Sequence, residues 1–253
     1  MPKITVDHVS KYYYLKRKGL FRKEKIQEIG LEDASFTVEQ GEFVFVIGSS
    51  GSGKSTLMKL LAGESAPDQG TVKINGKNIS KLGKGSRYRL PLLVGYVSQQ
   101  HSMNPRITIE ENLVLAAKIG KKKFKDEGNY GERIRKVLGL VGLPGVGKRY
   151  PVELTSGECR RIELASSLIN SPPILVLDEV TANLDADSMW DMYLLLHEIN
   201  QKGTTIIMST HNSDYVNMLR RRVITLVDGH IYSDEVKGRY GEATKKYDFP
   251  VML

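Results

Sequence analysis

Short apolar runs recur along the chain and predict buried strands. The clearest runs are Phe43–Ile47, Ile174–Asp178 and residues 204–210, each bounded by polar or glycine-containing segments. Continuous runs of about five β-branched or large apolar residues are typical of central parallel strands, because both faces of such strands are covered. Val94–Val97 is a fourth, shorter run. The pattern predicts an α/β protein with a mostly parallel sheet.

The N-terminal part of the chain has a different pattern, with short β-rich segments separated by turn residues. Residues 4–9 indicate an edge strand, and residues 35–38 and 71–74 indicate two further strands. Asn75-Gly76 is typical of a two-residue hairpin turn, because both positions tolerate positive φ. Residues 223–232 form a similar pattern around Asp-Gly. We therefore expect an antiparallel β subdomain beside the parallel core.

Helical periodicity dominates the middle of the chain. Thr108 and Glu111 have the capping-box spacing, which predicts a helix to about residue 119. A second helix is predicted over residues 132–140, and the polar stretch between the two helices is predicted as a loop. These elements together indicate a helical subdomain inserted at about residues 100–158.

The α/β pattern then resumes. One helix is predicted to begin at Ser156 or Gly157, and a later one to have Asp187 as its N-cap. No internal repeat interrupts the pattern. We expect a single domain over residues 1–242, followed by a C-terminal tail over residues 243–253.

The phosphate-binding P-loop pattern G-x-x-x-x-G-K-[ST] lies directly after the first apolar run. Its residues are Gly48, Ser49, Ser50, Gly51, Ser52, Gly53, Lys54, Ser55 and Thr56. The predicted strand before it and helix after it are the context that this motif requires. Glycine lets backbone N–H groups close around phosphate oxygens, and the helix N-terminus adds partial positive charge. We expect Lys54 to reach the β- and γ-phosphates and Ser55 to ligate Mg²⁺; a glycine-serine turn with a solvated lysine is the alternative.

Polar residues follow three other predicted strands, where ligands bind in open α/β sheets. Asp178 ends an apolar strand, as a magnesium-binding Walker B aspartate does, and Glu179 follows it. In an ATPase, such a second acid lies where a water fits between it and the γ-phosphate; a plain helix cap is the alternative interpretation of the pair. His211 follows the run at 204–210 and is a candidate γ-phosphate contact. Either Gln99 or Gln100 is a candidate ligand for Mg²⁺ or the attacking water.

Composition and charge restrict the class of protein. Hydrophobic residues make up 40% and charged residues 26% of the 253 residues, as in soluble globular proteins. No apolar run approaches the roughly 20 residues of a membrane span. The single Cys159 excludes an internal disulfide and fits a reducing compartment. The net charge of +8 is concentrated in two clusters, which indicate a solvated face or a contact with lipid, nucleic acid or a partner. These clusters are Lys16, Arg17, Lys18, Arg22, Lys23 and Lys25, and Lys121, Lys122, Lys123 and Lys125.

The motifs together resemble the ATP-binding cassette (ABC) ATPases, and their order over about residues 3–235 is the same as in that family. The stretch from Leu154 to Arg161 is similar to the LSGGQ signature, and Asp178 to Asp185 is similar to Walker B and the D-loop. Ser209-Thr210-His211 resembles the switch histidine, and Val97-Ser98-Gln99 resembles the Q-loop. The segment from Val9 to Tyr13 resembles the A-loop.

This resemblance implies a head-to-tail homodimer with each ATP between the P-loop of one subunit and the signature of the other. It implies that Tyr13 stacks on adenine and that Ser55, Gln99 and Asp178 hold Mg²⁺. Glu179 is then the general base and His211 the γ-phosphate sensor. The signature residues facing the partner's ATP are Thr155, Ser156, Gly157 and Glu158. Asp185 in the D-loop is expected to link the two ATP sites.

The chain departs from the family pattern at four positions. Thr155 replaces serine, Ser156 replaces a glycine, Cys159 replaces a glutamine, and Val180 replaces the proline after the Walker B glutamate. Ser156 adds a Cβ where phosphate approaches, which predicts slow turnover. Within the family, residues 219–224 and 238–241 are most similar to the FtsE cell-division ATPases, in the branch that also holds lipoprotein-release and macrolide-export ATPases.

We therefore expect an ATP-hydrolysing subunit at the cytoplasmic face of the cell membrane, driving a separate integral-membrane partner. The partner is expected to belong to an exporter or to an FtsE-like division complex. A soluble ABC ATPase acting on nucleic acid or ribosomes is the main alternative, which the net charge of +8 permits. A non-catalytic ATP-binding scaffold is a further alternative, suggested by Ser156.

Overall fold

The computed structural model describes residues 3–18, 23–120 and 130–241 and divides the chain into two compact units. The first unit comprises Met1–Lys81 and Met208–Leu253, and the second comprises Leu82–Ile207. The tail predicted over residues 243–253 and the loop predicted before residue 130 lie outside the described residues.

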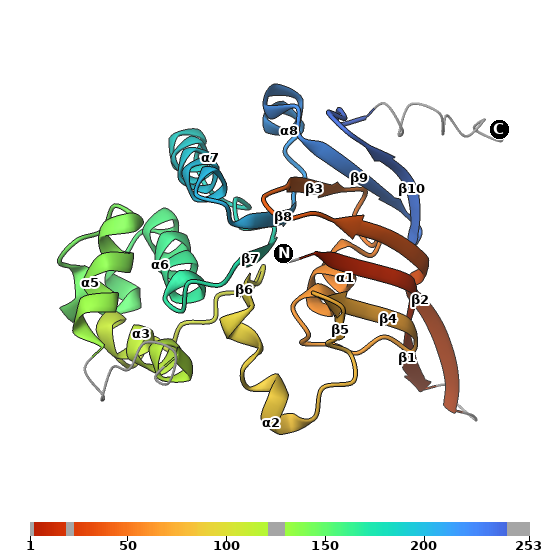
Figure 1. The fold of residues 1–253 in the computed structure, drawn as a ribbon, viewed down its shortest axis with the longest axis horizontal. Coiled ribbons are helices and arrows are strands. Elements are labelled where there is room, and N and C mark those ends of the chain that lie inside the picture. The colour runs from red at the N-terminus through yellow and green to blue at the C-terminus, as the bar shows by residue number, and fades with distance from the viewer. Residues whose placement is uncertain (1–2, 19–22, 121–129, 242–253) are drawn as a thin grey trace. The chain divides into compact units, whose positions relative to one another are not determined.

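An antiparallel sheet with the strand order β2-β1-β4-β5 belongs to the first unit (Figure 1). Its strands are β1 (Ile4–Lys18), β2 (Lys23–Val38), β4 (Gln69–Ile74) and β5 (Lys77–Asn78). The predicted hairpin between β4 and β5 is confirmed, because Asn75 and Gly76 have φ of 52° and 75°. The prediction of an edge strand over residues 4–9 is wrong, because β1 pairs with β2 on one side and β4 on the other.

The β1–β2 pairing extends far beyond the predicted strands. Its register runs from the Ile4–Val38 pair to the Lys18–Lys23 pair, with irregularities between Val6 and Tyr12. The basic stretch after Tyr14 is therefore the end of a long hairpin. The side chains of its lysines and arginines, and the whole Lys121–Lys125 cluster, lie outside the described residues.

Three more strands and two helices complete the first unit. The parallel pair β3 (Phe43–Ile47) and β9 (Arg222–Val227) is extended by β10 (His230–Glu235), which runs antiparallel to β9. The helices are α1 (Lys54–Leu61) and α8 (Ser213–Leu219). Every residue of β3 is buried, as its continuous apolar run predicts. Helix α8 was not predicted, because its seven residues are fewer than the windows of about 11–18 residues in which helical periodicity is detected.

The second unit contains the strands β6 (Val94–Val97) and β7 (Ile174–Asp178), which pair in parallel. Strand β8 (Thr205–Ser209) contains the boundary between the units. The short helices before β6 are α2 (Lys84–Arg87) and the 3₁₀ turn η1 (Leu90–Leu92). Both parallel strands have the bounds that the apolar runs predicted.

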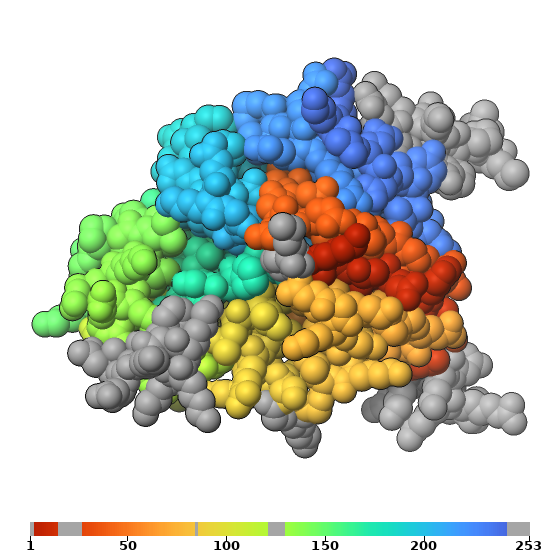
Figure 2. All heavy atoms as spheres, viewed as in Figure 1, coloured from red at the N-terminus to blue at the C-terminus, as the bar shows by residue number. Residues whose placement is uncertain are grey.

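Most of the second unit is helical. Its helices are α3 (Ile109–Ala117), α5 (Gly131–Leu140), α6 (Ser156–Leu168) and α7 (Ala186–Gln201), with 3₁₀ turns η2 (Lys118–Gly120), η3 (Val146–Lys148) and η4 (Pro151–Glu153). The predicted capping box of α3 is present, since Thr108 and Glu111 bond each other's backbone N–H groups. Helix α5, green in Figure 2, is at the surface of this unit.

The N-cap of α7 differs from the prediction. Asp185, and not Asp187, has extended backbone angles, and its carboxylate accepts a 2.8 Å hydrogen bond from the Ser188 N–H. Asp187 lies in the first helical turn, where its charge complements the helix dipole but caps nothing. Across the described ranges, no helix combines the length and the apolar character needed to cross a membrane.

Candidate functional site

The P-loop connects β3 to α1 in the first unit and has a backbone that only glycine allows. Gly48, Gly51 and Gly53 have φ of 151°, 80° and 101°. A Cβ on Gly48 would collide with the Leu226 carbonyl oxygen and the Ser52 hydroxyl. Gly48 and Gly53 thus have no space for a side chain, whereas Gly51 needs glycine only for its positive φ. The backbone N–H groups of the loop remain accessible to an anion.

Two side chains of the loop fit a phosphate group. Lys54 is 4% exposed, and its ammonium donates 2.9 Å hydrogen bonds to the carbonyl oxygens of Gly48 and Ser49. The Ser52 hydroxyl is buried and has no hydrogen-bond partner among the described residues. Leaving such a group unpaired costs about 1–3 kcal/mol. A phosphate oxygen within the loop would supply acceptors for both groups, so the residues present fit a nucleotide phosphate.

The remaining P-loop residues lie where the motif predicts. Ser49 and Ser50 are exposed in the loop, and Ser55 and Thr56 are in the first turn of α1. The Thr56 hydroxyl donates a 3.4 Å hydrogen bond to the Tyr13 hydroxyl. The structure thus places the predicted adenine-stacking residue beside the P-loop.

Gly30 is a site residue that the sequence analysis missed. A Cβ at Gly30 would lie 2.6 Å from Cε2 of Tyr13, and its carbonyl oxygen faces Gly53 of the P-loop. Glycine at this position of β2 therefore lets the Tyr13 ring lie across the strand, next to the phosphate loop. The Tyr13 side chain keeps 38% of its surface exposed, which leaves it accessible to a ligand. No sequence signal marks Gly30, because its importance depends on the β1–β2 register.

In the second unit, β7 ends at the predicted pair of acids. Asp178 is 1% exposed, and Glu179 follows with a positive φ of 50°. This backbone angle is uncommon for a residue other than glycine and turns the chain sharply after the strand. The side-chain amide of Gln99 donates a 3.0 Å hydrogen bond to Oε2 of Glu179. Both glutamines left open by the sequence are exposed, and it is the Gln99 side chain that the structure brings to Glu179.

The signature segment forms the N-terminus of α6 through a capping box. The Thr155 hydroxyl accepts from the Glu158 N–H at 3.2 Å, and the Glu158 carboxylate accepts from the Thr155 N–H at 2.8 Å. This backbone hydrogen bond lowers the pKa of Glu158 below its ordinary value of 4.5. Ser156 is exposed at the first helical position. The capping box leaves the end of the helix ordered and open to solvent.

Gly157 brings the signature helix into contact with the N-terminus of α7. A Cβ at Gly157 would lie 2.9 Å from the Ser188 hydroxyl and 3.3 Å from the Ser188 Cβ. The same hydroxyl donates a 2.7 Å hydrogen bond to Asp185, whose pKa is lowered mainly by the Ser188 backbone N–H. The structure therefore joins the predicted signature and D-loop residues through Ser188, which the sequence analysis did not identify.

His211 belongs to the first unit, directly after β8. The buried Thr210 before it donates its N–H to the Val46 carbonyl oxygen at 3.2 Å, and His211 itself is exposed. The first unit thus holds Tyr13, the P-loop and His211. The second unit holds the glutamine, the two acids, the signature and the D-loop aspartate.

These motifs define the class of protein. Residues 31–182 match the family model described as ABC transporter. The chain belongs to the ABC transporter family, and it is an ATP-binding cassette of the ATP-hydrolysing type.

Several similar proteins are bacterial and share one name, cell division ATP-binding protein FtsE. The relative from Streptococcus pneumoniae (strain D39) is 41% identical over 211 residues, which cover 83% of this chain and 90% of the relative. The relative from Bacillus subtilis (strain 168) is 37% identical over 211 residues, covering 83% and 91%. The relative from Mycobacterium tuberculosis (strain H37Rv) is 37% identical over 238 residues, covering 94% and 98%. The predicted resemblance to the FtsE branch is confirmed.

Solved structures with the same fold include two of the cassette MJ0796. A dimeric post-hydrolysis state bound to ADP and Pi has a TM-score of 0.78 and 27% identity, covering 94% of this chain and all of that one. A second dimeric structure of this bacterial ABC transporter cassette has a TM-score of 0.77, also at 27% identity and with the same coverage. The predicted fold class, a P-loop ABC ATPase core with an antiparallel sheet and added helices, is confirmed.

Proposed function

We propose that the chain dimerises on ATP binding and drives a separate integral-membrane protein of a cell-division complex. Two findings support this proposal: its relatives carry the name cell division ATP-binding protein FtsE, and the similar cassette MJ0796 forms dimers. An exporter is the alternative assembly within the same family. In either case we place the chain at the cytoplasmic face of the membrane, attached through its partner.

The P-loop and Tyr13 bind the nucleotide in this proposal. Tyr13 stacks on adenine, and Lys54 leaves the carbonyl oxygens of Gly48 and Ser49 to pair with the phosphates. The Ser52 hydroxyl donates to a phosphate oxygen and so gains the partner that it lacks among the described residues. Helix α1 supports the negative charge with its N-terminal dipole.

The main support for a role of Glu179 in hydrolysis is its hydrogen bond with Gln99 at the end of β7. A carboxylate in this position can act as the general base that takes a proton from the attacking water. Gln99 orients the carboxylate and a water beside it. His211 is proposed to contact the γ-phosphate.

Magnesium is assigned to Ser55, Gln99 and Asp178 by their chemistry. Mg²⁺ prefers oxygen ligands and is often bound by only one or two carboxylates together with substrate phosphates. A hydroxyl, an amide oxygen and one buried carboxylate fit this preference. When bound, the ion neutralises charge that develops on the phosphates.

The signature is proposed to complete the ATP site of the partner subunit. Thr155, Ser156, Gly157 and Glu158 lie at the N-terminus of α6, where backbone N–H groups and the helix dipole favour a phosphate. Ser188 hydrogen-bonds to Asp185 at the start of α7 and lies against Gly157 of this helix. Each subunit then contributes to both ATP sites of the dimer.

The test is affinity purification of the Glu179→Gln protein from detergent-solubilised membranes of its own cells, with ATP present. Removal of the base should trap the ATP-bound dimer, so a stoichiometric integral-membrane protein should co-purify. Lys54→Met, which should not bind ATP, is the matched control. Recovery of only RNA or ribosomes, with strongly salt-dependent binding, would instead support a soluble nucleic-acid-directed ATPase. Hydrolysis by Glu179→Gln at the wild-type rate would support the non-catalytic scaffold.

A further inference from the structure

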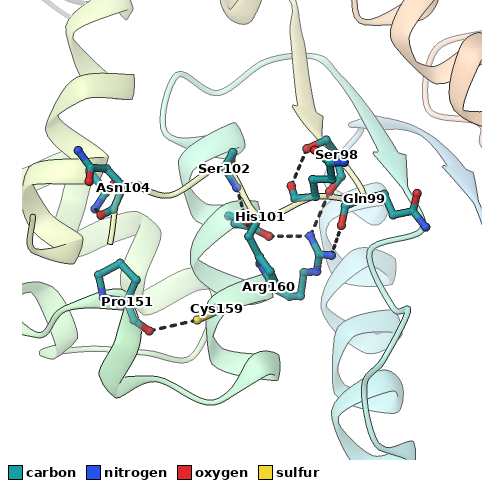
Figure 3. Close-up of polar contacts among 11 residues, drawn as sticks. Ser98, Gln99, His101, Ser102, Asn104, Pro151, Cys159 and Arg160 are labelled. Atoms are coloured by element: carbon teal, nitrogen blue, oxygen red, sulfur yellow. Dashed lines mark hydrogen bonds and ion pairs between the residues drawn. The ribbon is translucent and has the colours of Figure 1, made fainter. Parts of the chain in front are cut away.

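A buried arginine on the signature helix holds the segment that carries Gln99 (Figure 3). Arg160 is 5% exposed on α6. Its guanidinium donates a 3.0 Å hydrogen bond to the Ser98 carbonyl oxygen and a short one to the Gln99 carbonyl oxygen. The same group is paired with Glu163, one helical turn further on, at 2.8 Å. A planar guanidinium with five donors can make these bonds at once, which a lysine ammonium cannot do with the same geometry.

Glu163 holds the other side of the same segment. Its side chain is 2% exposed, and Oε1 accepts a 2.9 Å hydrogen bond from the Ser102 N–H and contacts Nδ1 of His101 at 3.1 Å. Residues 98–102 have no helix or strand to order them. The ion pair therefore supplies hydrogen-bond partners to this irregular segment at both its ends.

The energetics of this pair favour a role in positioning. Burying a carboxylate and a guanidinium costs several kcal/mol of desolvation per ion, and an apolar pair of similar volume is often equally stable. Residues 98–102 leave β6 without regular secondary structure. Apart from the Ser98 hydroxyl bond to the Gln100 carbonyl oxygen, the hydrogen bonds described for their main chain are those to the pair. Gln99 is the residue of this segment whose side chain reaches Glu179.

We propose that Arg160 is a positioning residue for hydrolysis: with Glu163, it fixes the main chain of residues 98–102 so that the Gln99 amide is aimed at Glu179. This inference rests on the proposed function, because it takes Glu179 as the base and Gln99 as its orienting partner. It adds that the signature helix and the catalytic glutamine are mechanically joined within one subunit. Displacement of α6 then displaces Gln99 through the Arg160 guanidinium.

The experiment compares the variants Arg160→Met and Arg160→Met/Glu163→Gln. The single variant leaves a buried carboxylate unpaired and is at risk of unfolding, so the double variant carries the test. It removes both charges, and the glutamine still accepts from the Ser102 N–H. We expect the double variant to remain folded with kcat about tenfold lower and KM changed less than about twofold. Amide exchange of the peptide containing residues 98–102 should become faster.

A double-mutant cycle with Gln99→Ala separates positioning from a merely structural effect. If Arg160 acts through Gln99, adding Arg160→Met/Glu163→Gln to Gln99→Ala should change kcat less than about twofold. Losses that multiply, or an unchanged kcat in the folded double variant, would overturn the proposal. The same assays with Glu179→Gln test the proposed function separately, because full activity of that variant would reject Glu179 as the base.

Arg133 provides the matched control, because it also binds main-chain carbonyls from within the second unit. It donates to the carbonyl oxygen of Ala117 at 2.6 Å and to Oδ1 of Asn170 at 2.9 Å, and it has no bond to residues 98–102 among its described contacts. Arg133→Met should lower the melting temperature while leaving kcat and the exchange of residues 98–102 unchanged. A fall in kcat equal to that of the Arg160 double variant would also overturn the proposal, because it would show a general loss of rigidity.

Discussion

The Gln99 side-chain amide donates a 3.0 Å hydrogen bond to the Glu179 carboxylate, and 80 residues of sequence separate the two. Glutamine follows β6 and glutamate follows β7, and these strands pair in parallel. Their carboxyl ends therefore lie at the same edge of the sheet, which brings the two side chains together. The glutamate is further held by a left-handed backbone with φ of 50°. The candidate base thus has a defined side-chain partner at this edge of the sheet.

The first prediction concerns the choice between two adjacent glutamines. Gln99→Ala removes the amide that orients Glu179, so kcat should fall about tenfold or more, while ATP affinity should change little. Steady-state hydrolysis and binding of a fluorescent ATP analogue measure the two effects.

Gln100→Ala is the control for this prediction. The Gln100 residue is exposed, and its backbone carbonyl, which accepts from the Ser98 hydroxyl at 2.7 Å, is retained in the variant. Its activity should match the wild type. Equal losses in the two variants would show that the segment tolerates no substitution and that the Gln99 amide has no special role.

The sequence predicted the strands and motifs well because local patterns encode them. Continuous apolar runs gave the bounds of β3, β6 and β7, and the capping box of α3 lies within four residues of sequence. The edge position of the first strand was predicted wrongly, because its pairing with β4 joins residues far apart in sequence, from Ser10 with Gln69 to Ile4 with Ile74. Sheet order is not a property of a single segment.

The parts of the site that were missed are contacts between distant segments. Gly30 matters because the Tyr13 ring crosses β2, and Ser188 because it touches Gly157. Asp185 and Asp187 are both good N-caps by residue type, and only the backbone angles decide between them. The Arg160–Glu163 pair has the i, i+3 spacing that exposed ion pairs on helices also have. Only the structure shows that both side chains are buried and therefore set apart from such surface pairs.

The second prediction tests the contact between the signature helix and α7. Gly157→Ala would place a Cβ 2.9 Å from the Ser188 hydroxyl, closer than normal van der Waals contact. We expect lower thermal stability and lower ATPase activity, both partly restored in Gly157→Ala/Ser188→Ala. Overpacking of this kind typically costs about 1–3 kcal/mol.

Gly139→Ala is the matched control for this prediction. Gly139 lies within α5, and a Cβ there would meet nothing within 4 Å. The same substitution should therefore stabilise the protein by about 0.4–1 kcal/mol, because alanine favours the helix and restricts the unfolded chain. A stabilising effect of Gly157→Ala as well would contradict the proposed contact.

The third prediction concerns stability at acidic pH. The Thr155 N–H lowers the pKa of Glu158 below 4.5 in the folded protein. A lowered folded pKa means that the unfolded state binds more protons in this range, so unfolding becomes easier as the pH falls. The stabilisation is fully present well above pH 4.5 and is lost as the pH falls through the lower folded pKa. Glu158→Gln keeps the capping acceptor without titrating, so its unfolding free energy should depend less on pH in this window.

Glu111→Gln is the companion variant, since Thr108 lowers the pKa of Glu111 in the same way at the start of α3. Chemical denaturation between pH 3 and pH 7 should show a flatter profile for each variant than for the wild type. Hydrolysis by Glu111→Gln should remain at the wild-type rate, because α3 carries none of the proposed catalytic residues. A profile of Glu158→Gln as steep as that of the wild type would exclude the capping carboxylate as a source of acid sensitivity.

The fourth prediction addresses the serine that replaces a signature glycine. Ser156 is exposed at the first position of α6, so its Cβ and hydroxyl stand at the helix end proposed to face the partner's ATP. A side chain there restricts how closely the backbone N–H groups approach phosphate, which should slow turnover. Ser156→Gly, alone or with Thr155→Ser, should raise kcat several-fold and strengthen ATP-dependent dimerisation measured by light scattering.

Ser156→Ala keeps the Cβ and removes only the hydroxyl, so it should remain as slow as the wild type. Equal acceleration by the alanine and glycine variants would assign the effect to the hydroxyl, and no acceleration in either would show that the signature serine does not limit turnover.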